Sequence, residues 1–157
     1  MPFRTNLAIA LLAAAPILAF SGHANATGGS MSCGYVSTET GTIPQSKDLF
    51  HAMITQIDGR PPRLVKYEYK LDAGKHILVI GEDINSTRLN SAQLTQIRKM
   101  KRTSRPGYFK VLILDVQPGT SYRLGVRLLR DKLDTQSIRD NAYWEPVVWE
   151  EVPQACP

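Results

Sequence analysis

The stretch Val65-Lys66-Tyr67-Glu68-Tyr69-Lys70-Leu71 decides the fold class, because apolar and charged side chains alternate along it without a break. Successive side chains of a β-strand point to opposite faces, so this order places the apolar residues on one face and the charges on the other. The stretch therefore predicts a half-buried strand in a sheet that has one face on the core.

The flanking residues predict the neighbours of this strand. Asp72-Ala73-Gly74-Lys75 is a turn sequence and Ile77 to Ile80 is an apolar run, so residues 64–81 are predicted to form a β-hairpin. Upstream, Ala52 to Ile57 alternates in the same way. The segment Arg60-Pro61-Pro62-Arg63 is expected to be the connecting loop, because its prolines cannot donate hydrogen bonds to a sheet.

The second half of the chain repeats this pattern. Tyr108 to Val116 is rich in β-branched and aromatic residues, Gln117-Pro118-Gly119-Thr120 is a turn sequence, and Tyr122 to Leu129 is the next predicted strand. Tyr143 to Val152 should be the last strand, at an edge or with a bulge, because Pro146 interrupts it. We therefore predict an all-β fold, an antiparallel β-sandwich of about seven strands.

One helix competes with this all-β pattern, at residues 91–101. Asn90 and Gln93 resemble a capping box, and Leu94 and Ile97 have helical spacing. The sequence predicts a single short helical segment here.

The N-terminus has the pattern of a secretory signal peptide. The apolar run Leu7 to Phe20 is shorter than the roughly 18 to 20 residues that span a bilayer, and Ala24-Asn25-Ala26 matches an A-x-A cleavage site. Residues 1–26 are thus predicted to be removed, and residues 27–157 to form a single β-sandwich domain in the periplasm or outside the cell, with no transmembrane segment. An uncleaved anchor is the less favoured alternative.

The chain has two cysteines, Cys33 and Cys156, near the two ends of this domain. In an oxidising compartment they are expected to form a disulfide, which would stabilise the fold by about 4 to 5 kcal/mol. A free thiol or an intermolecular bridge is the alternative.

Short motifs add a resemblance to known folds. The segment from Val116 to Leu124 resembles the tyrosine corner of fibronectin type III and other immunoglobulin-like domains, in which the hydroxyl of a residue such as Tyr122 bonds back to the upstream chain. Ile57-Asp58-Gly59 with the segment 71–79 resembles PEGA-type surface modules of bacteria. The whole domain, including Tyr143 to Val148, is similar to small uncharacterised exported proteins of Gram-negative bacteria. The resemblance implies an immunoglobulin-like sandwich and supplies no catalytic residue.

Few residues of the chain suggest catalysis or metal binding. After signal cleavage His51 and His76 are the histidines, and the sequence has no G-x-S-x-G elbow, P-loop or dinucleotide-binding glycine motif. Asp48-x-x-His51-x-Met53 offers ligands that copper accepts, but a surface histidine and a core methionine are the more ordinary explanation. We therefore expect no catalytic residue, no metal site and no cofactor.

A cluster of cations is the one unusual feature, in a chain of 157 residues with a formal net charge of +5. No acidic residue occurs from Ile84 to Leu114, and the cations there include a dense group at Arg98, Lys99, Lys101, Arg102 and Arg105. Such a group attracts polyanions, and outside the cytoplasm these are anionic lipid headgroups, lipopolysaccharide or acidic glycans rather than nucleic acid. The alternative is a solvated loop whose charges keep strand edges apart.

The sequence thus favours a non-catalytic exported binding or structural module of the cell envelope. Its expected partner is an envelope protein, bound at a sheet edge, or an anionic envelope component, bound by the basic cluster. The alternative is a small exported copper carrier or an enzyme that uses His51 or His76.

Overall fold

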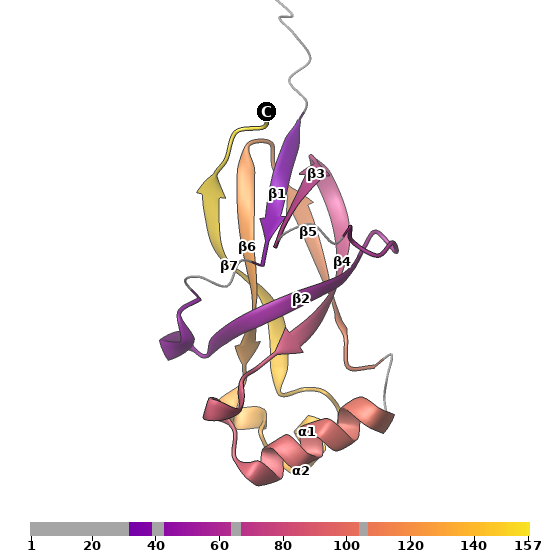
Figure 1. Cartoon of the computed structure of the whole chain (residues 1–157), viewed down its shortest axis with the longest axis vertical. Helices are drawn as coiled ribbons and strands as arrows, with labels where there is room; N and C mark the ends of the chain where they lie inside the picture. Colours follow the sequence, from indigo (N-terminus) through magenta and orange to yellow (C-terminus); the bar gives the residue numbers. More distant parts are fainter. Residues whose placement is uncertain (1–31, 39–42, 64–66, 104–106) are drawn as a thin grey trace, which may run out of the picture.

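A computed structural model describes residues 32–38, 43–63, 67–103 and 107–157 (Figure 1). The predicted signal peptide, and Val65 and Lys66 of the alternating stretch, lie outside the described residues. The strands are β1 (Cys33–Ser37), β2 (Leu49–Ile57), β3 (Glu68–Asp72), β4 (Gly74–Asp83), β5 (Lys110–Val116), β6 (Thr120–Leu128) and β7 (Trp144–Pro153). The helices are α1 (Ser91–Thr103) and α2 (Thr135–Arg139), with short 3-10 turns at η1 (Gln45–Lys47), η2 (Ser86–Arg88) and η3 (Arg130–Lys132).

The seven strands form one mixed, open sheet. Its order is β3-β1-β6-β2-β4-β5, and β7 pairs with β6 along the side that β1 and β2 leave free. A mainly β fold with seven strands is thereby confirmed for the described residues. The expectation of a purely antiparallel sheet is wrong, because β1 runs parallel to β6. The pairings do not define two stacked layers of an immunoglobulin-like sandwich.

The predicted hairpin at residues 64–81 is wrong, although both of its strands exist. β3 pairs with β1, with Leu71 opposite Gly34, whereas β4 pairs with β2 and β5. The turn between β3 and β4 therefore connects two strands that are not hydrogen-bonded to each other. Gly74 has a φ of 130°, which favours glycine, and Ala73 N donates to Ser32 O at 2.7 Å.

The last strand agrees with its prediction. β7 covers Trp144–Pro153 and pairs only with β6, so Pro146 lies on an edge strand, where its missing N–H disrupts no ladder.

The helix predicted at residues 91–101 is confirmed, and it extends to Thr103. Asn90 and Gln93 cap it reciprocally, each side-chain oxygen accepting from the other residue's backbone N at 2.9 Å. Residues 98–103 of the basic stretch are therefore helical. The sequence analysis missed α2, whose N-cap is Asp134.

The hydrophobic core is one cluster of buried side chains from the strands and from both helices. Ile97 and Met100 of α1 and Ile138 of α2 are buried in the same cluster as Trp144 and the strand side chains. Figure 1 places both helices at one end of the sheet, and the C-terminus beside the start of β1 at the other end. No helix of the described residues is long and apolar enough to cross a bilayer.

The predicted disulfide is present at the end opposite the helices. Cys33 and Cys156 are joined with their Cα atoms 6.0 Å apart, across 123 positions of sequence. A stable disulfide is typical of proteins in an oxidising compartment.

The tyrosine corner also has its hydrogen bonds. Tyr122 is buried, its hydroxyl donates to Asp115 O at 3.3 Å, and it accepts from Gln117 N at 3.0 Å. These bonds hold the turn between β5 and β6 against the core.

The outer face of β2, β4 and β5 carries exposed apolar side chains. Ile77 and Ile113 face each other across the β4–β5 ladder, with 48% and 61% of their surface exposed. Val111 lies opposite Val79, Met53 lies opposite Gly81, and both are exposed. This face contributes little to the core.

Candidate anion-binding site

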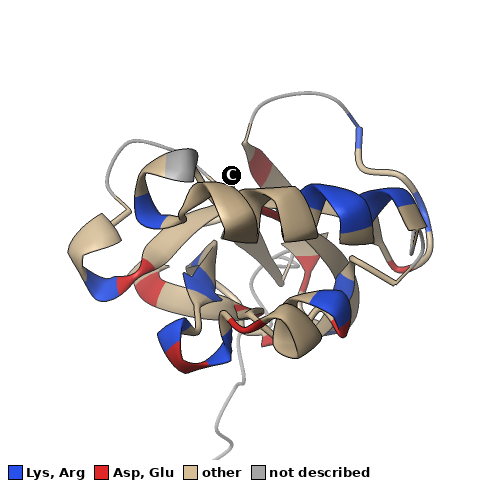
Figure 2. Cartoon of the chain, turned by 90° about the horizontal axis from the view of Figure 1, so that it is seen from below, with Lys and Arg blue, Asp and Glu red and all other residues tan. Residues whose placement is uncertain are grey.

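The second half of α1 presents most of the predicted basic cluster at the end of the molecule. Arg98, Lys99 and Arg102 are exposed, because Ile97 and Met100 occupy the face of the helix that packs on the core. Figure 2 shows Lys and Arg gathered at one end of this helix. Arg105 lies outside the described residues.

Lys101 is directed to a different partner, the carboxylate of Glu82. Glu82 ends the buried part of β4, and its side chain is 3% exposed. The sequence groups Lys101 with the other cations, but in the structure its charge is paired with an acid 19 positions upstream. Lys101 therefore fastens α1 to the sheet rather than facing solvent as a free cation.

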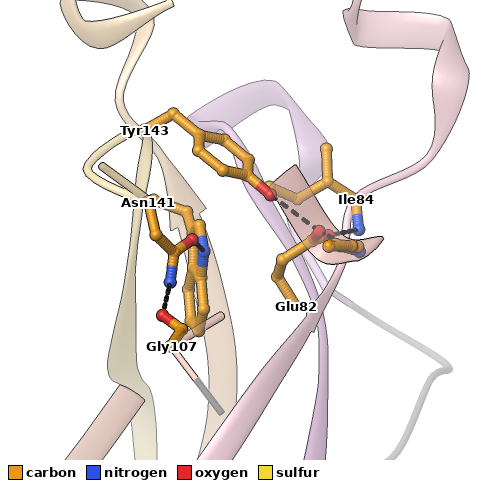
Figure 3. A network of polar contacts seen from close by, with 7 residues as sticks. Glu82, Ile84, Gly107, Asn141 and Tyr143 are labelled. Carbon is orange, nitrogen blue, oxygen red and sulfur yellow. Dashed lines mark hydrogen bonds and ion pairs between the residues drawn. The ribbon is translucent and has the colours of Figure 1, made fainter. Parts of the chain in front are cut away.

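Glu82 is held by two more hydrogen bonds (Figure 3). The hydroxyl of Tyr143 donates to Oε1 at 2.8 Å, and the backbone N of Ile84 donates to Oε2 at 2.7 Å. Burial raises the pKa of the Tyr143 hydroxyl above its ordinary value, and the neighbouring carboxylate adds to this effect. Tyr143 is thus a fixed donor that satisfies a buried carboxylate, as burial of a charge requires.

Asn141, in the loop before β7, makes two further hydrogen bonds nearby. Its φ is 55°, and its Nδ2 donates to Gly107 O at 3.0 Å while its Oδ1 accepts from Trp144 Nε1 at 2.6 Å. Asn141 thereby ties Gly107 to Trp144, the first residue of β7.

A small pocket lies where α1 meets α2. Its volume is ≈ 120 Å³, and it is lined by Gln96, Lys99, Met100, Thr103 and Arg139. Two lining residues are cations and two are neutral hydrogen-bonding residues. Such a lining is suited to a compact anionic group.

The pocket's cations lack acidic partners in the part of the chain that is described. Neither Lys99 nor Arg139 forms an ion pair there, and the same holds for Arg98 and Arg102. The cations of α1 also face the negative end of the helix dipole, which stabilises the helix. Arg139 was missed by the sequence analysis, because nothing in its local sequence marks a contact with α1.

The histidines and Asp48 are engaged elsewhere. His76 contacts Asp58 Oδ2 through Nδ1 at 2.7 Å and Asp72 O through Nε2 at 2.8 Å. Both partners accept, so a doubly protonated imidazole satisfies them best. Burial opposes this form, but the two hydrogen bonds outweigh it and hold the pKa of His76 above its ordinary value.

The residues considered for copper are not gathered into a site. Asp48 accepts from Arg130 at 2.7 and 2.5 Å, and this hydrogen bond lowers the pKa of its carboxyl. His51 lies opposite Asp83 in the β2–β4 ladder. Among the described residues, no three His, Cys, Asp or Glu side chains are placed to hold a metal ion.

Comparison of the chain with protein-family models, with curated proteins and with solved structures gives no match.

Proposed function

We propose that this protein is a non-catalytic exported module that binds an anionic component of the cell envelope through the α1 end of the fold. The observation that carries the proposal is the group of exposed cations Arg98, Lys99, Arg102 and Arg139, which have no acidic partner among the described residues. Lipid headgroups, lipopolysaccharide phosphates and acidic glycans all present the anionic oxygens that such a group attracts.

Export supports this choice of ligand. The disulfide between Cys33 and Cys156 favours an oxidising compartment, and residues 1–26 have the pattern of a signal peptide. In the periplasm or outside the cell, the abundant polyanions belong to the envelope.

The rigid placement of α1 supports binding rather than a solvated loop. Lys101, Glu82 and Tyr143 fasten the helix to the sheet, so the remaining cations are presented at fixed positions. A basic residue near an anionic membrane surface contributes about 1 kcal/mol to binding. The three free cations of α1 together would contribute about 3 kcal/mol, or about 100-fold in affinity.

The test is a charge-matched pair of variants. One replaces Arg98, Lys99 and Arg102 with Gln and keeps Lys101, which the buried carboxylate needs. The control replaces three exposed cations far from α1, Arg60, Lys70 and Lys75, with Gln. Both variants lose the same net charge, and sedimentation with phosphatidylglycerol vesicles or with lipopolysaccharide measures binding.

The α1 variant should lose binding and the control should keep it. Equal loss in both variants would mean that net charge alone drives adsorption, and this would refute a site at α1. Retention of binding by the α1 variant would refute it as well. Parallel experiments with phosphatidylcholine vesicles should show no binding by any form of the protein.

A further inference from the structure

The connection between β4 and α1 contains a second chemical signature, the sequence Asp83-Ile84-Asn85-Ser86-Thr87. An Asn followed two positions later by Thr, with a residue other than Pro between them, is the acceptor motif for asparagine-linked glycans in exported proteins. Bacterial transferases of this class require in addition a carboxylate two positions before the Asn, which Asp83 provides. The segment meets both requirements.

The structure presents this motif on the surface. Asp83, Asn85 and Thr87 are all exposed, at the end of β4 and in the turn η2. The hydroxyl of Thr87 donates to Asn85 Oδ1 at 2.5 Å, so the acceptor amide and the hydroxyl lie on the same side of the turn. A transferase can therefore reach both groups from one direction without unfolding the sheet.

The other asparagines are less suited. Asn141 is buried and hydrogen-bonded to Gly107 and Trp144, and the side chain of Asn90 caps α1. Neither is followed by Ser or Thr at the second position. Asn25-Ala26-Thr27 has the motif, but it has no acidic residue two positions before Asn25 and spans the predicted cleavage site.

We propose that Asn85 carries an asparagine-linked glycan. This inference rests on the proposed export, because the transferases of this class work outside the cytoplasm. The donor is an oligosaccharide on a polyprenyl diphosphate. Nδ2 of Asn85 forms a bond to C1 of the first sugar and loses one proton to a base of the transferase. The C1–O bond to the diphosphate breaks, and polyprenyl diphosphate leaves with the bonding electrons.

The position of Asn85 is compatible with the anion site. Asn85 precedes α1, whereas the free cations begin at Arg98, and a helix rises about 1.5 Å per residue. From Ser91 to Arg98 the helix alone covers about 10 Å. The glycan would cover the start of α1 and leave its basic end open.

The test is peptide mapping of the protein purified from its native source. Trypsin cleaves after Lys75 and Arg88, so the motif is contained in the single peptide His76–Arg88. Its mass should be raised by that of a glycan in the wild-type protein and should return to the bare value in Asn85→Gln and Thr87→Ala. Thr87→Ser keeps the hydroxyl and should keep the glycan. Asp83→Ala should abolish the glycan if a bacterial enzyme attaches it and should retain it if the enzyme needs only the shorter motif.

The state of the rest of the chain separates the two proposals. A bare His76–Arg88 peptide in protein that begins at Thr27 and contains the Cys33–Cys156 disulfide would overturn the glycosylation inference and leave the proposed function intact. A chain that keeps its first residues and has both thiols free would instead overturn export, and both proposals with it.

Discussion

Replacing Tyr143 with Phe tests whether the buried network fastens α1 to the sheet. The Tyr143 side chain is fully buried, and the substitution removes only the hydroxyl that donates to Glu82 at 2.8 Å. A hydrogen bond to a charged group contributes about 1.5–3 kcal/mol to stability. Glu82 keeps its bonds to Ile84 N and Lys101, so we expect a loss in the lower part of this range, about 2 kcal/mol.

Urea unfolding followed by circular dichroism measures this loss. For a small domain, about 2 kcal/mol corresponds to a shift of about 1 M in the midpoint. Tyr108→Phe is the matched control, because Tyr108 is half-buried and its hydroxyl makes no hydrogen bond within the described residues. That control should change the free energy of unfolding by less than about 0.5 kcal/mol.

A double-mutant cycle isolates the contact. In a Glu82→Gln background the acceptor is neutral, so Tyr143→Phe should cost only about 1 kcal/mol. If Tyr143→Phe destabilises the wild-type protein no more than Tyr108→Phe does, the network does not hold the helix and the reasoning is refuted.

Three further predictions concern other parts of the fold. Replacing both Cys33 and Cys156 with Ser should lower the free energy of unfolding by about 5 kcal/mol, since the bridge closes a loop of over 100 residues; chemical denaturation of the two forms measures this, and a loss below about 1 kcal/mol would contradict it. Because the pKa of His76 is raised in the fold, the stability that its protonated form contributes should be fully present below about pH 6.5 and should decline as the pH rises through the folded pKa. The free energy of unfolding, measured across this range, should decline less in Asp58→Asn than in the wild-type protein. An equal decline in the two proteins would exclude the His76–Asp58 pair as its cause. Ile113→Thr should cost less than about 1 kcal/mol, because most of this side chain is already exposed, and should shorten retention on a hydrophobic column; a larger cost would mean that the outer face is covered.

The sequence predicted the strands better than their partners. Alternation places Tyr69 and Leu71 on one face of a strand, and both are half-buried in β3. Two strands joined by a short turn look the same in sequence whether they form a hairpin or a corner. Which strand β3 joins is decided by a contact with β1, far upstream, and by the backbone bond from Ala73 to Ser32. The local sequence pattern does not predict such long-range pairing.

The candidate site was predictable in part, for a similar reason. The cation-rich, acid-free segment was evident, and its helical character followed from the capping residues Asn90 and Gln93. Two features depend on how α1 and α2 pack: Lys101 pairs with Glu82, and Arg139 lines the pocket. These contacts join residues that are distant in sequence. The spacing of the cations alone therefore could not distinguish Lys101, which is paired with Glu82, from the unpaired cations of α1.

Binding at α1 is tested most directly by the dissociation constant for phosphatidylglycerol vesicles, measured for the wild-type protein and for the variant in which Arg98, Lys99 and Arg102 are replaced with Gln. We expect binding about 100-fold weaker in this variant, from about 1 kcal/mol per cation, and unchanged binding in the charge-matched control. Equal affinities for the wild-type protein and the α1 variant would contradict an anion site at α1.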